Sequence, residues 1–404
     1  MTKPAAAPPL VLMVLLLFAT QACTDIFLPG LPAIAAGFGV PMHTANLTIS
    51  AYNISQAVVV LFIGVISDLV GRRPALLVCL ALHIGASASI AATGSLPWMI
   101  AMRVVQAAGS GAVYIVLRLA IKDTMDKQAQ VHATGLLVTG LVLSPILAPV
   151  AGAWIIGVSN WRGCFWAIAV LEAPLFLWAW RAIGETNHRQ DALRAAFSWR
   201  AHGAAYVTVL KDGYFGGLAL VVGASFAAFY AFIGISSYLY IGQYGVAPAH
   251  YALAFIAIAG CYLAGNRWMS RMNAAHAAPQ RIAGTGLAVA AVGAGAVLLA
   301  PVAAGTVNAI AAITVGTCLL RVATALINPP VQVVVTNHFQ DQGAHALGLL
   351  TCIQYAFAAA GTMVVSSLPL RPGASYAVST ALFVLLAAAG YAWAFRSTPA
   401  VQRT

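Results

Sequence analysis

The sequence predicts an all-α membrane protein with twelve transmembrane helices in two six-helix halves. Of its 404 residues, 61% are apolar and only 7% are charged, whereas charged residues make up roughly 25% of a soluble domain. A helix needs about 20 apolar residues to span a bilayer, and the chain contains twelve separate stretches of that kind. The longest polar interval falls between the sixth and the seventh. An ordinary soluble protein is therefore excluded.

Each of the twelve stretches is assigned by its hydropathy and its length. The first could be mistaken for a cleaved signal peptide, because Lys3 precedes an apolar core and Cys23 resembles a lipoprotein cleavage site. Thr20 and Gln21 fit that pattern badly, so we expect this stretch to remain as a span. In chain order the stretches cover residues 8–36, 44–66, 74–93, 97–117, 132–157, 163–182, 213–239, 250–269, 282–302, 306–336, 344–368 and 374–395.

The polar interval divides the chain into three parts. We expect an N-terminal half at residues 1–182, a cytoplasmic linker at 183–212 and a C-terminal half at 213–404. Nothing in the linker has the spacing of a ligand set or a catalytic site, so it is predicted to be a connection. Two equal sets of six spans indicate an internal repeat, an arrangement in which two halves rock about a site near the bilayer midplane.

The loop cations predict the orientation. Positively charged residues are enriched in cytoplasmic loops, and one set of loops contains sixteen of them while the other set contains only Arg162 and Arg371. Both termini are therefore expected in the cytoplasm. The sixteen are Lys3, Arg72, Arg73, Arg118, Lys122, Lys127, Arg181, Arg189, Arg194, Arg200, Lys211, Arg267, Arg271, Arg281, Arg396 and Arg403.

Several other classes of function are disfavoured. The net charge of +11 is distributed as a topology signal, so we expect no nucleic-acid partner. The six cysteines form no CxxC pair, and His43, His83, His338 and His345 lack partners at ligand spacing, so neither a metal, a cofactor nor an integral-membrane enzyme is indicated. No loop resembles the selectivity filter of a channel.

A specific motif lies on the predicted cytoplasmic side between the second and third spans. It reads Gly64-Val-Ile-Ser-Asp68-Leu-Val-Gly71-Arg72-Arg73-Pro74. Gly71 allows a tight turn, and Asp68 can pair with Arg72 or Arg73 to form a latch at the membrane face. With this ten-residue pattern, G-x-x-x-D-x-x-G-R-R, the chain resembles the major facilitator superfamily of secondary transporters.

Other motifs resemble the drug/proton antiporter branch of that superfamily. They are Asp25-Ile-Phe-Leu-Pro29-Gly-Leu-Pro32 in the first span and Arg103-Val-Val-Gln106-Ala-Ala-Gly109 in the fourth. The fifth span, with Gly140, Pro145, Pro149 and Gly152, is similar to the antiporter motif. It departs from that motif at Ser144, Ala148 and Ala153, where glycine is usual.

Together these motifs most resemble the Bcr/CflA group of bacterial exporters, which expel drugs and, in some cases, siderophores. The resemblance implies proton-coupled export of small amphiphilic molecules by alternating access, in a monomer spanning the lipid bilayer of the bacterial inner membrane. A proton-linked importer remains the alternative, because the fifth-span motif is altered.

Three ionisable residues at membrane depth are candidates for proton coupling. Asp25 can carry a proton or act only as a helix–helix hydrogen-bond partner, and Glu172 is either a second proton carrier or a residue with a structural or lipid-snorkelling role. Arg103 must find acceptors, most simply Asp25 or backbone carbonyls of a neighbouring broken helix. His83 is expected to be a hydrogen-bonded structural residue.

Substrate-binding candidates lie in the second half. Arg321 can contact an anionic or oxygen-rich substrate, or it can be occupied by carbonyls freed where Pro329 and Pro330 break the tenth span. The remaining candidates, Tyr230, Gln354 and Tyr355, either line an amphiphile-binding cavity or face lipid.

Overall fold

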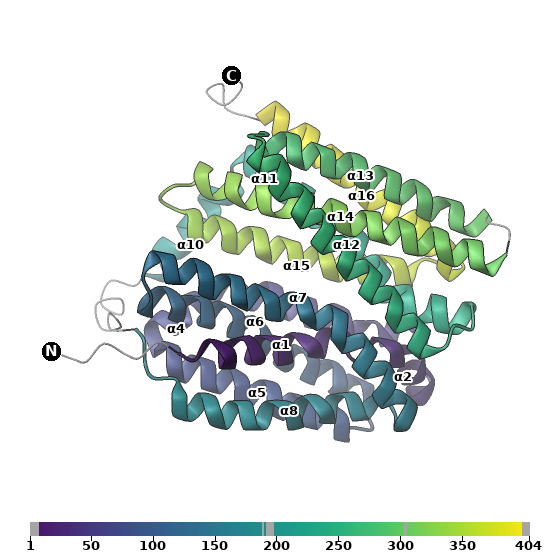
Figure 1. The fold of residues 1–404 in the computed structure, drawn as a ribbon, viewed down its shortest axis with the longest axis horizontal. Helices are drawn as coiled ribbons and strands as arrows, with labels where there is room; N and C mark the ends of the chain where they lie inside the picture. Colours follow the sequence, from purple (N-terminus) through teal and green to yellow (C-terminus); the bar gives the residue numbers. More distant parts are fainter. Residues whose placement is uncertain (1–7, 188–189, 191–197, 303–304, 398–404) are drawn as a thin grey trace. The chain divides into compact units, whose positions relative to one another are not determined.

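The computed structural model describes residues 8–187, 190, 198–302 and 305–397, and over these ranges it contains helices and no strand. Twelve helices or helix pairs are long and apolar enough to cross a membrane. Each of them overlaps one of the twelve apolar stretches, so the predicted fold class is confirmed. The chain forms two compact units, Met1–Phe197 and Ser198–Thr404 (Figure 1).

The N-terminal unit contains the first six spans. Helices α1 and α7 pack together, as do α5 and α6, and α5 and α8 (Figure 1). Its elements are α1 (Leu10–Asp25), η1 (Leu28–Gly30), α2 (Leu31–Phe38), α3 (Met42–Ala45), α4 (Leu47–Val70), α5 (Arg72–Ala92), α6 (Leu96–Thr124), α7 (Lys127–Val158) and α8 (Trp161–Ala182).

The first span is interrupted. Helix α1 ends at Asp25, the 3-10 turn η1 follows, and α2 continues the span. Pro29 and Pro32 account for the break, because each lacks the N–H that an α-helix would use. The interruption leaves carbonyl groups in the last turn of α1 without donors from their own helix.

The C-terminal unit contains the last six spans. In chain order its elements are α10 (Trp199–Leu210), α11 (Gly213–Ser237), η2 (Tyr238–Gln243), α12 (Pro248–Ala274), α13 (Pro279–Leu299), η3 (Ala300–Val302), α14 (Thr306–His338), α15 (Gly343–Ser367) and α16 (Pro372–Ser397). Helix α10 occupies the end of the predicted linker and packs on α15 and α11. Lys3, Arg189, Arg194 and Arg403 lie outside the described residues.

One expectation about the tenth span is wrong. We expected Pro329 and Pro330 to break it, but α14 runs without interruption from Thr306 to His338. A proline removes one hydrogen bond from a helix, and packing against neighbouring helices can hold the rest of it straight enough to continue. Helix α14 is packed in this way, since it contacts α11, α12, α13 and α15.

Asp212 orders the start of the seventh span. Asp212 caps α11 by accepting the backbone N–H of Phe215 at 2.8 Å, and its other oxygen lies 2.9 Å from His338 Nε2. Partial burial favours the neutral acid, but the hydrogen bonds from His338 and Phe215 outweigh it and lower the pKa of Asp212.

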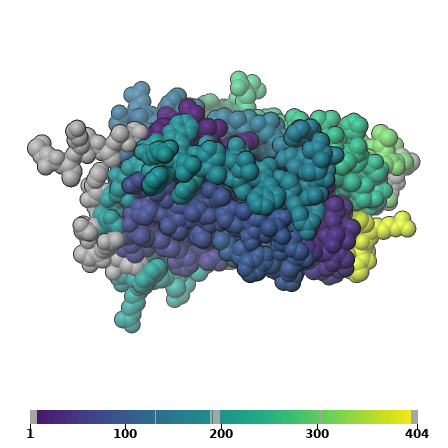
Figure 2. Space-filling view, turned by 90° about the horizontal axis from the view of Figure 1, so that it is seen from below, coloured from purple at the N-terminus to yellow at the C-terminus, as the bar shows by residue number. Residues whose placement is uncertain are grey.

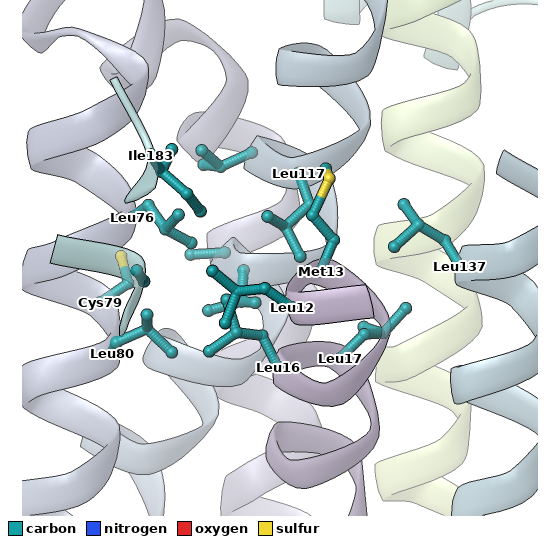
Figure 3. Packing of buried hydrophobic residues seen from close by; sticks show 14 of the residues in the cluster. Leu12, Met13, Leu16, Leu17, Leu76, Cys79, Leu80, Leu117, Leu137 and Ile183 are labelled. Carbon is teal, nitrogen blue, oxygen red and sulfur yellow. The ribbon is translucent and has the colours of Figure 1, made fainter. Parts of the chain in front are cut away.

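Buried apolar residues of α1 and α5 belong to the core of the N-terminal unit. Leu12 and Leu16, one turn apart on α1, point toward Leu76 and Leu80 of α5 (Figure 3). All four side chains are buried. Seen from below, the purple to teal atoms of this unit are closely packed (Figure 2). This packing fixes α1 and α5, and both carry residues of the site described next.

Candidate functional site

Arg103 lies at the centre of a polar network inside the N-terminal unit. It is on α6 and only 1% exposed. Its guanidinium donates to the Thr48 carbonyl at 3.2 Å, to the Cys23 carbonyl at 3.3 Å and to Gln106 Oε1 at 2.6 Å. Cys23 lies in the last turn of α1, where the interrupted span leaves carbonyls without helical donors. The expected use of carbonyls from a broken helix is therefore confirmed.

Aromatic rings surround the same guanidinium. Its central carbon lies 4.1 Å from the ring centroid of Tyr52 and 4.6 Å from that of Phe27, with Phe165 at 6.0 Å. Such contacts stabilise a cation that has been removed from water. Arg103 thus connects α1, α4 and α8 to its own helix.

The spacing of the fourth-span motif follows from helix geometry. Gln106 is three residues after Arg103, and its amide donates to Ser87 of α5 at 2.7 Å. Gly109 is a further three residues along, where a β-carbon would lie 2.8 Å from the β-carbon of His83. The motif therefore places one face of α6 directly against α5.

His83 connects a buried acid to this network. Its Nδ1 is 2.7 Å from Glu172 Oε2 on α8, and its Nε2 is 3.3 Å from Cys23 Sγ. Both side chains are 0% exposed, so neither is in contact with lipid headgroups or water. The snorkelling role of Glu172 is excluded, and His83 is hydrogen-bonded as expected.

Asp25 is placed beside the network rather than at its centre. It is the last residue of α1, two residues after Cys23, and it is half-buried. It is thus more accessible than Glu172 or Arg103. This position suits a carboxyl that exchanges protons, because proton exchange requires contact with water in at least one access state.

The predicted ion pair of the latch motif is present, and its network includes more residues than the sequence motif. Arg72 is buried, and its guanidinium bonds Asp68 at 2.5 Å, Ser67 at 2.6 Å and Asp123 at 3.1 Å. Asp123 is at the end of α6, so the guanidinium joins three helix ends. Asp68 remains 35% exposed, so this ion pair is accessible from one side.

Glu185, just after α8, completes the latch. Its carboxylate accepts the backbone N–H of Arg72 at 2.9 Å and that of Arg73 at 3.1 Å, which are the first two residues of α5. Negative charge is favoured at a helix N-terminus. Gly71 has φ +110°, and a β-carbon there would lie 2.5 Å from Glu185 Oε2. The motif therefore requires glycine for two reasons.

The fifth span packs on the first through two glycines. A β-carbon at Gly140 would lie 2.8 Å from the Val14 carbonyl oxygen, and one at Gly152 would overlap the Ile26 carbonyl oxygen. Pro145 and Pro149 lie inside α7 without interrupting it. The two glycines of the antiporter-like motif thus set the α1–α7 contact, where α1 gives way to its turn.

In the C-terminal unit, Arg321 lies among aromatic rings. The central carbon of its guanidinium is 4.0 Å from the ring centroid of Phe229 and 4.5 Å from that of Tyr262. Arg321 itself is half-buried. Contact with the rings on α11 and α12 is a third environment for this cation, besides the two expected.

Two of the other substrate candidates, Tyr230 and Tyr355, belong to the same aromatic group. Phe229 contacts Tyr230, which stacks on Phe226 at a centroid distance of 5.4 Å, and Phe226 meets Tyr355 edge-on at 6.4 Å. Tyr230 and Tyr355 are half-buried, whereas Gln354 is only 9% exposed. The structure therefore brings Arg321, Tyr230 and Tyr355 into one continuous cluster, the α11 aromatic cluster.

Sequence reasoning missed several members of these networks. Cys23, Tyr52, Ser87, Asp123 and Glu185 were not candidates, because their partners are far away along the chain. Gln106 lies inside the fourth-span motif, so the sequence did indicate that its position is functionally or structurally special. Among the described residues, no group of three His, Cys, Asp or Glu side chains is placed to hold a metal ion.

The fold and site define a polytopic membrane protein with two six-span units, a buried ionisable network and an ionic latch at helix ends. Its sequence matches the family model of the Major Facilitator Superfamily over residues 13–362. The chain belongs to this superfamily, whose members are transporters and not enzymes.

Curated relatives carry multidrug names. The chain is 28% identical over 271 residues to the multidrug transporter MdfA of Yersinia pestis bv. Antiqua (strain Angola), an alignment that covers 67% of this chain and 65% of that protein. It is 29% identical over 261 residues to multidrug resistance protein D of Escherichia coli (strain K12), covering 63% and 65%. The chain thus spans just under two thirds of these relatives.

Solved structures support the fold alone. A bacterial homologue of the human lysosomal transporter Spinster, in an inward-facing and occupied conformation, has a TM-score of 0.75 at 15% identity, covering 98% of this chain and 97% of that one. The xylose transporter XylE from E. coli has a TM-score of 0.71 at 12% identity, covering 98% of both chains.

Proposed function

We propose that this protein exports small amphiphilic molecules, drugs among them, from the cytoplasm in exchange for protons. It would work by alternating access as a monomer in the bacterial inner membrane, with both termini in the cytoplasm. Its halves would be residues 1–182 and 213–404, joined by the linker 183–212. The multidrug names of its relatives support the substrate class.

The observation that carries the proposal is the Arg103 network. A guanidinium at 1% exposure is costly in a membrane segment and is retained where it has a function. Here it is held by carbonyls and rings next to Asp25, while Glu172 is connected through His83 and Cys23. Carboxyls that gain and lose protons beside a fixed cation provide the chemistry of proton coupling.

Transport in everted membrane vesicles tests this function. The cytoplasmic face is outside in such vesicles, so an exporter should accumulate a fluorescent drug in the lumen when the lumen is made acidic. An ionophore that collapses the pH gradient should release it. Loss of drug from preloaded vesicles under an acidic lumen would instead indicate an importer, and a flux that ignores the gradient would refute proton coupling.

We propose further that Arg321 favours neutral, zwitterionic or anionic oxygen-rich substrates, including siderophore-like hydroxamates and carboxylates. Phe229 of the α11 aromatic cluster lies against a face of the Arg321 guanidinium. A guanidinium binds carboxylates through the N–H groups at its edges, so contact with a ring is compatible with binding an oxygen-rich substrate. Tyr230, Gln354 and Tyr355 would contact the apolar part of the substrate.

The change Arg321→Lys tests this preference. Lysine keeps the charge but cannot bind an oxygen pair in bidentate fashion. Export of anionic and oxygen-rich compounds should fall by about tenfold, the effect of roughly 1.4 kcal/mol, while export of simple dye cations stays unchanged. Equal export of both classes by both proteins would refute the role of Arg321 in substrate choice.

A further inference from the structure

Two fully buried titratable groups face one another between α5 and α8. His83 Nδ1 and Glu172 Oε2 are 2.7 Å apart, and both side chains are 0% exposed. The second carboxyl oxygen, Glu172 Oε1, is buried with no hydrogen-bond partner among the described residues. A buried carboxylate oxygen without a hydrogen bond destabilises the fold, and a proton on the carboxyl lowers that cost because burial favours the neutral form. This geometry leaves room for a proton on the carboxyl.

The Cys23 thiol lies between the His83–Glu172 pair and Tyr52, so the direction of its hydrogen bond depends on the proton count of the pair. The thiol has one hydrogen but two possible acceptors, Tyr52 Oη at 3.5 Å and His83 Nε2 at 3.3 Å. If the thiol donates to Tyr52, Nε2 must carry a proton and donate to the sulfur. His83 Nδ1 and Glu172 Oε2 then share a second proton, held as imidazolium and carboxylate or as neutral imidazole and carboxylic acid. If the thiol donates to Nε2, His83 is neutral. The two arrangements differ by one proton.

The charges nearby favour exchange between these two arrangements. In the first arrangement the pair is neutral, and the proton between Nδ1 and Oε2 can lie on the Glu172 carboxyl; after the Nε2 proton is lost, His83 is neutral, Glu172 is a carboxylate and the pair carries one negative charge. Arg103 Nη1 is 3.9 Å from the same Cys23 sulfur, and the permanent positive charge of Arg103 stabilises the anionic form of the pair. A doubly protonated pair would be positive and would be opposed by Arg103.

We propose that His83 and Glu172 form a second proton-binding site, whose proton state is transmitted to Arg103 through the thiol of Cys23. The proposal rests on proton-coupled export being the function. When the pair loses its proton, the thiol hydrogen turns from Tyr52 to His83, and Arg103 gains a nearby negative charge. Its bonds to the Cys23 and Thr48 carbonyls tie α1 and α4 to α6, so the proton state affects how firmly those helices are joined.

The groups that surround the pair come from every helix packed on it. Within the described residues, Glu172 is the carboxylate that bonds His83, and no second carboxylate does so. The titratable and charged groups bonded to the pair or to its thiol partner are Cys23 on α1, Tyr52 on α4 and Arg103 on α6; Asp25 lies two residues after Cys23.

Infrared difference spectroscopy tests the site without a substrate. In purified full-length protein, acidification should produce a protonated-carboxyl stretching band that disappears in Glu172→Gln and shifts in His83→Asn. A merely structural pair would keep Glu172 ionised throughout, so identical bands in the wild type and Glu172→Gln would overturn the proposal. Thermal unfolding of each variant, and the double variant His83→Asn/Glu172→Gln, separates loss of the site from loss of the fold.

Thiol substitutions test the connection to Arg103. Cys23→Ala should shift the pH dependence of drug uptake into everted vesicles, whereas Cys23→Ser, which keeps one donor hydrogen, should restore most of it. Cys79→Ala is the matched control, since it removes a buried thiol one turn before His83. An unchanged pH profile in Cys23→Ala would overturn the connection. Failure of the wild type to respond to pH at all would instead refute the proposed function.

Discussion

At the scale of single residues, the candidate site is recognised by a charged side chain that is buried although burial of a charge is costly. Arg103 is the bulkiest of the fully buried side chains. It is tolerated because an interrupted helix supplies a carbonyl at Cys23 and two aromatic rings lie within 5 Å of its central carbon. Pro29 and Pro32, which break the first span, and Arg103 of the fourth span therefore contribute to the same polar network.

The first prediction concerns Asp25. Replacing it by Asn should reduce pH-driven uptake of a fluorescent drug into everted vesicles to the level of vesicles without the protein, because an amide cannot exchange a proton. Insertion and the amount of protein in the membrane should stay normal. Asp25→Glu, which retains a titratable group, is the control and should keep part of the activity. Unchanged pH-driven transport in Asp25→Asn would shift proton coupling to His83 and Glu172.

At this scale the sequence predicted which residues were unusual but not all of their partners. Asp25, Arg103 and Glu172 were identified because an ionisable residue inside an apolar stretch is visible without a structure. The pairing of His83 with Glu172 joins residues 89 positions apart, and no local spacing encodes such a contact. Its two helices are adjacent only because the whole unit packs that way.

At the scale of elements, helix ends and helix crossings determine how the N-terminal unit is assembled. The latch joins the ends of α4, α6 and α8 to the start of α5 through Arg72, Asp123 and Glu185. The contact between the first span and α7 depends on Gly140, beside Val14, and on Gly152, beside Ile26. The C-terminal unit has the same kind of glycine contact between helices, because a β-carbon at Gly361 of α15 would overlap the Ala227 carbonyl of α11.

The second prediction concerns the latch. Asp68→Ala or Arg72→Ala should lower turnover by about tenfold with little change in drug affinity, because the latch biases one access state by roughly 1.4 kcal/mol without touching the substrate. Glu185→Gln should act in the same direction. Arg73→Ala is the control, since its guanidinium bonds only the exposed Trp180 carbonyl among the contacts described. A large loss of affinity with normal turnover would place this loop in the binding site instead.

The third prediction concerns the α1–α7 crossing. Gly152→Ala should destabilise the protein by about 1 to 3 kcal/mol, because the added methyl group overlaps the Ile26 carbonyl and forces the helices apart. A lower midpoint of thermal unfolding in detergent would show this. Gly157→Ala lies on the same helix with nothing within 4 Å of its β-carbon, so it should be neutral or slightly stabilising. Equal midpoints for the two variants would contradict the role of Gly152.

Element boundaries followed hydropathy closely, and backbone irregularities did not. All twelve stretches became spans because length and composition alone decide insertion in a bilayer. Proline was the less reliable signal. Pro29 lies at a true interruption, whereas Pro329 and Pro330 lie within a continuous helix. The difference depends on what packs beside each proline, which the local sequence does not contain.

At the scale of the whole molecule, the two compact units correspond to the two sets of six apolar stretches. Ionisable groups at membrane depth are distributed unequally between them. The N-terminal unit contains Asp25, Arg103 and Glu172 with their partners, and the C-terminal unit contains Arg321 with the α11 aromatic cluster. We therefore infer a division of labour, with proton chemistry in the first unit and recognition of an amphiphilic molecule in the second.

The last prediction concerns the orientation on which this division depends. Because sixteen loop cations lie on one side of the predicted spans, that side should be cytoplasmic. A membrane-impermeant maleimide should label Ser95→Cys, in the loop between α5 and α6, in intact cells. It should label Ala201→Cys, which is exposed on α10, only after the membrane is opened. The unmodified protein controls for its six native thiols. Labelling of Ala201→Cys in intact cells would reverse the topology, and the direction of transport would reverse with it, since the latch would then close the opposite face.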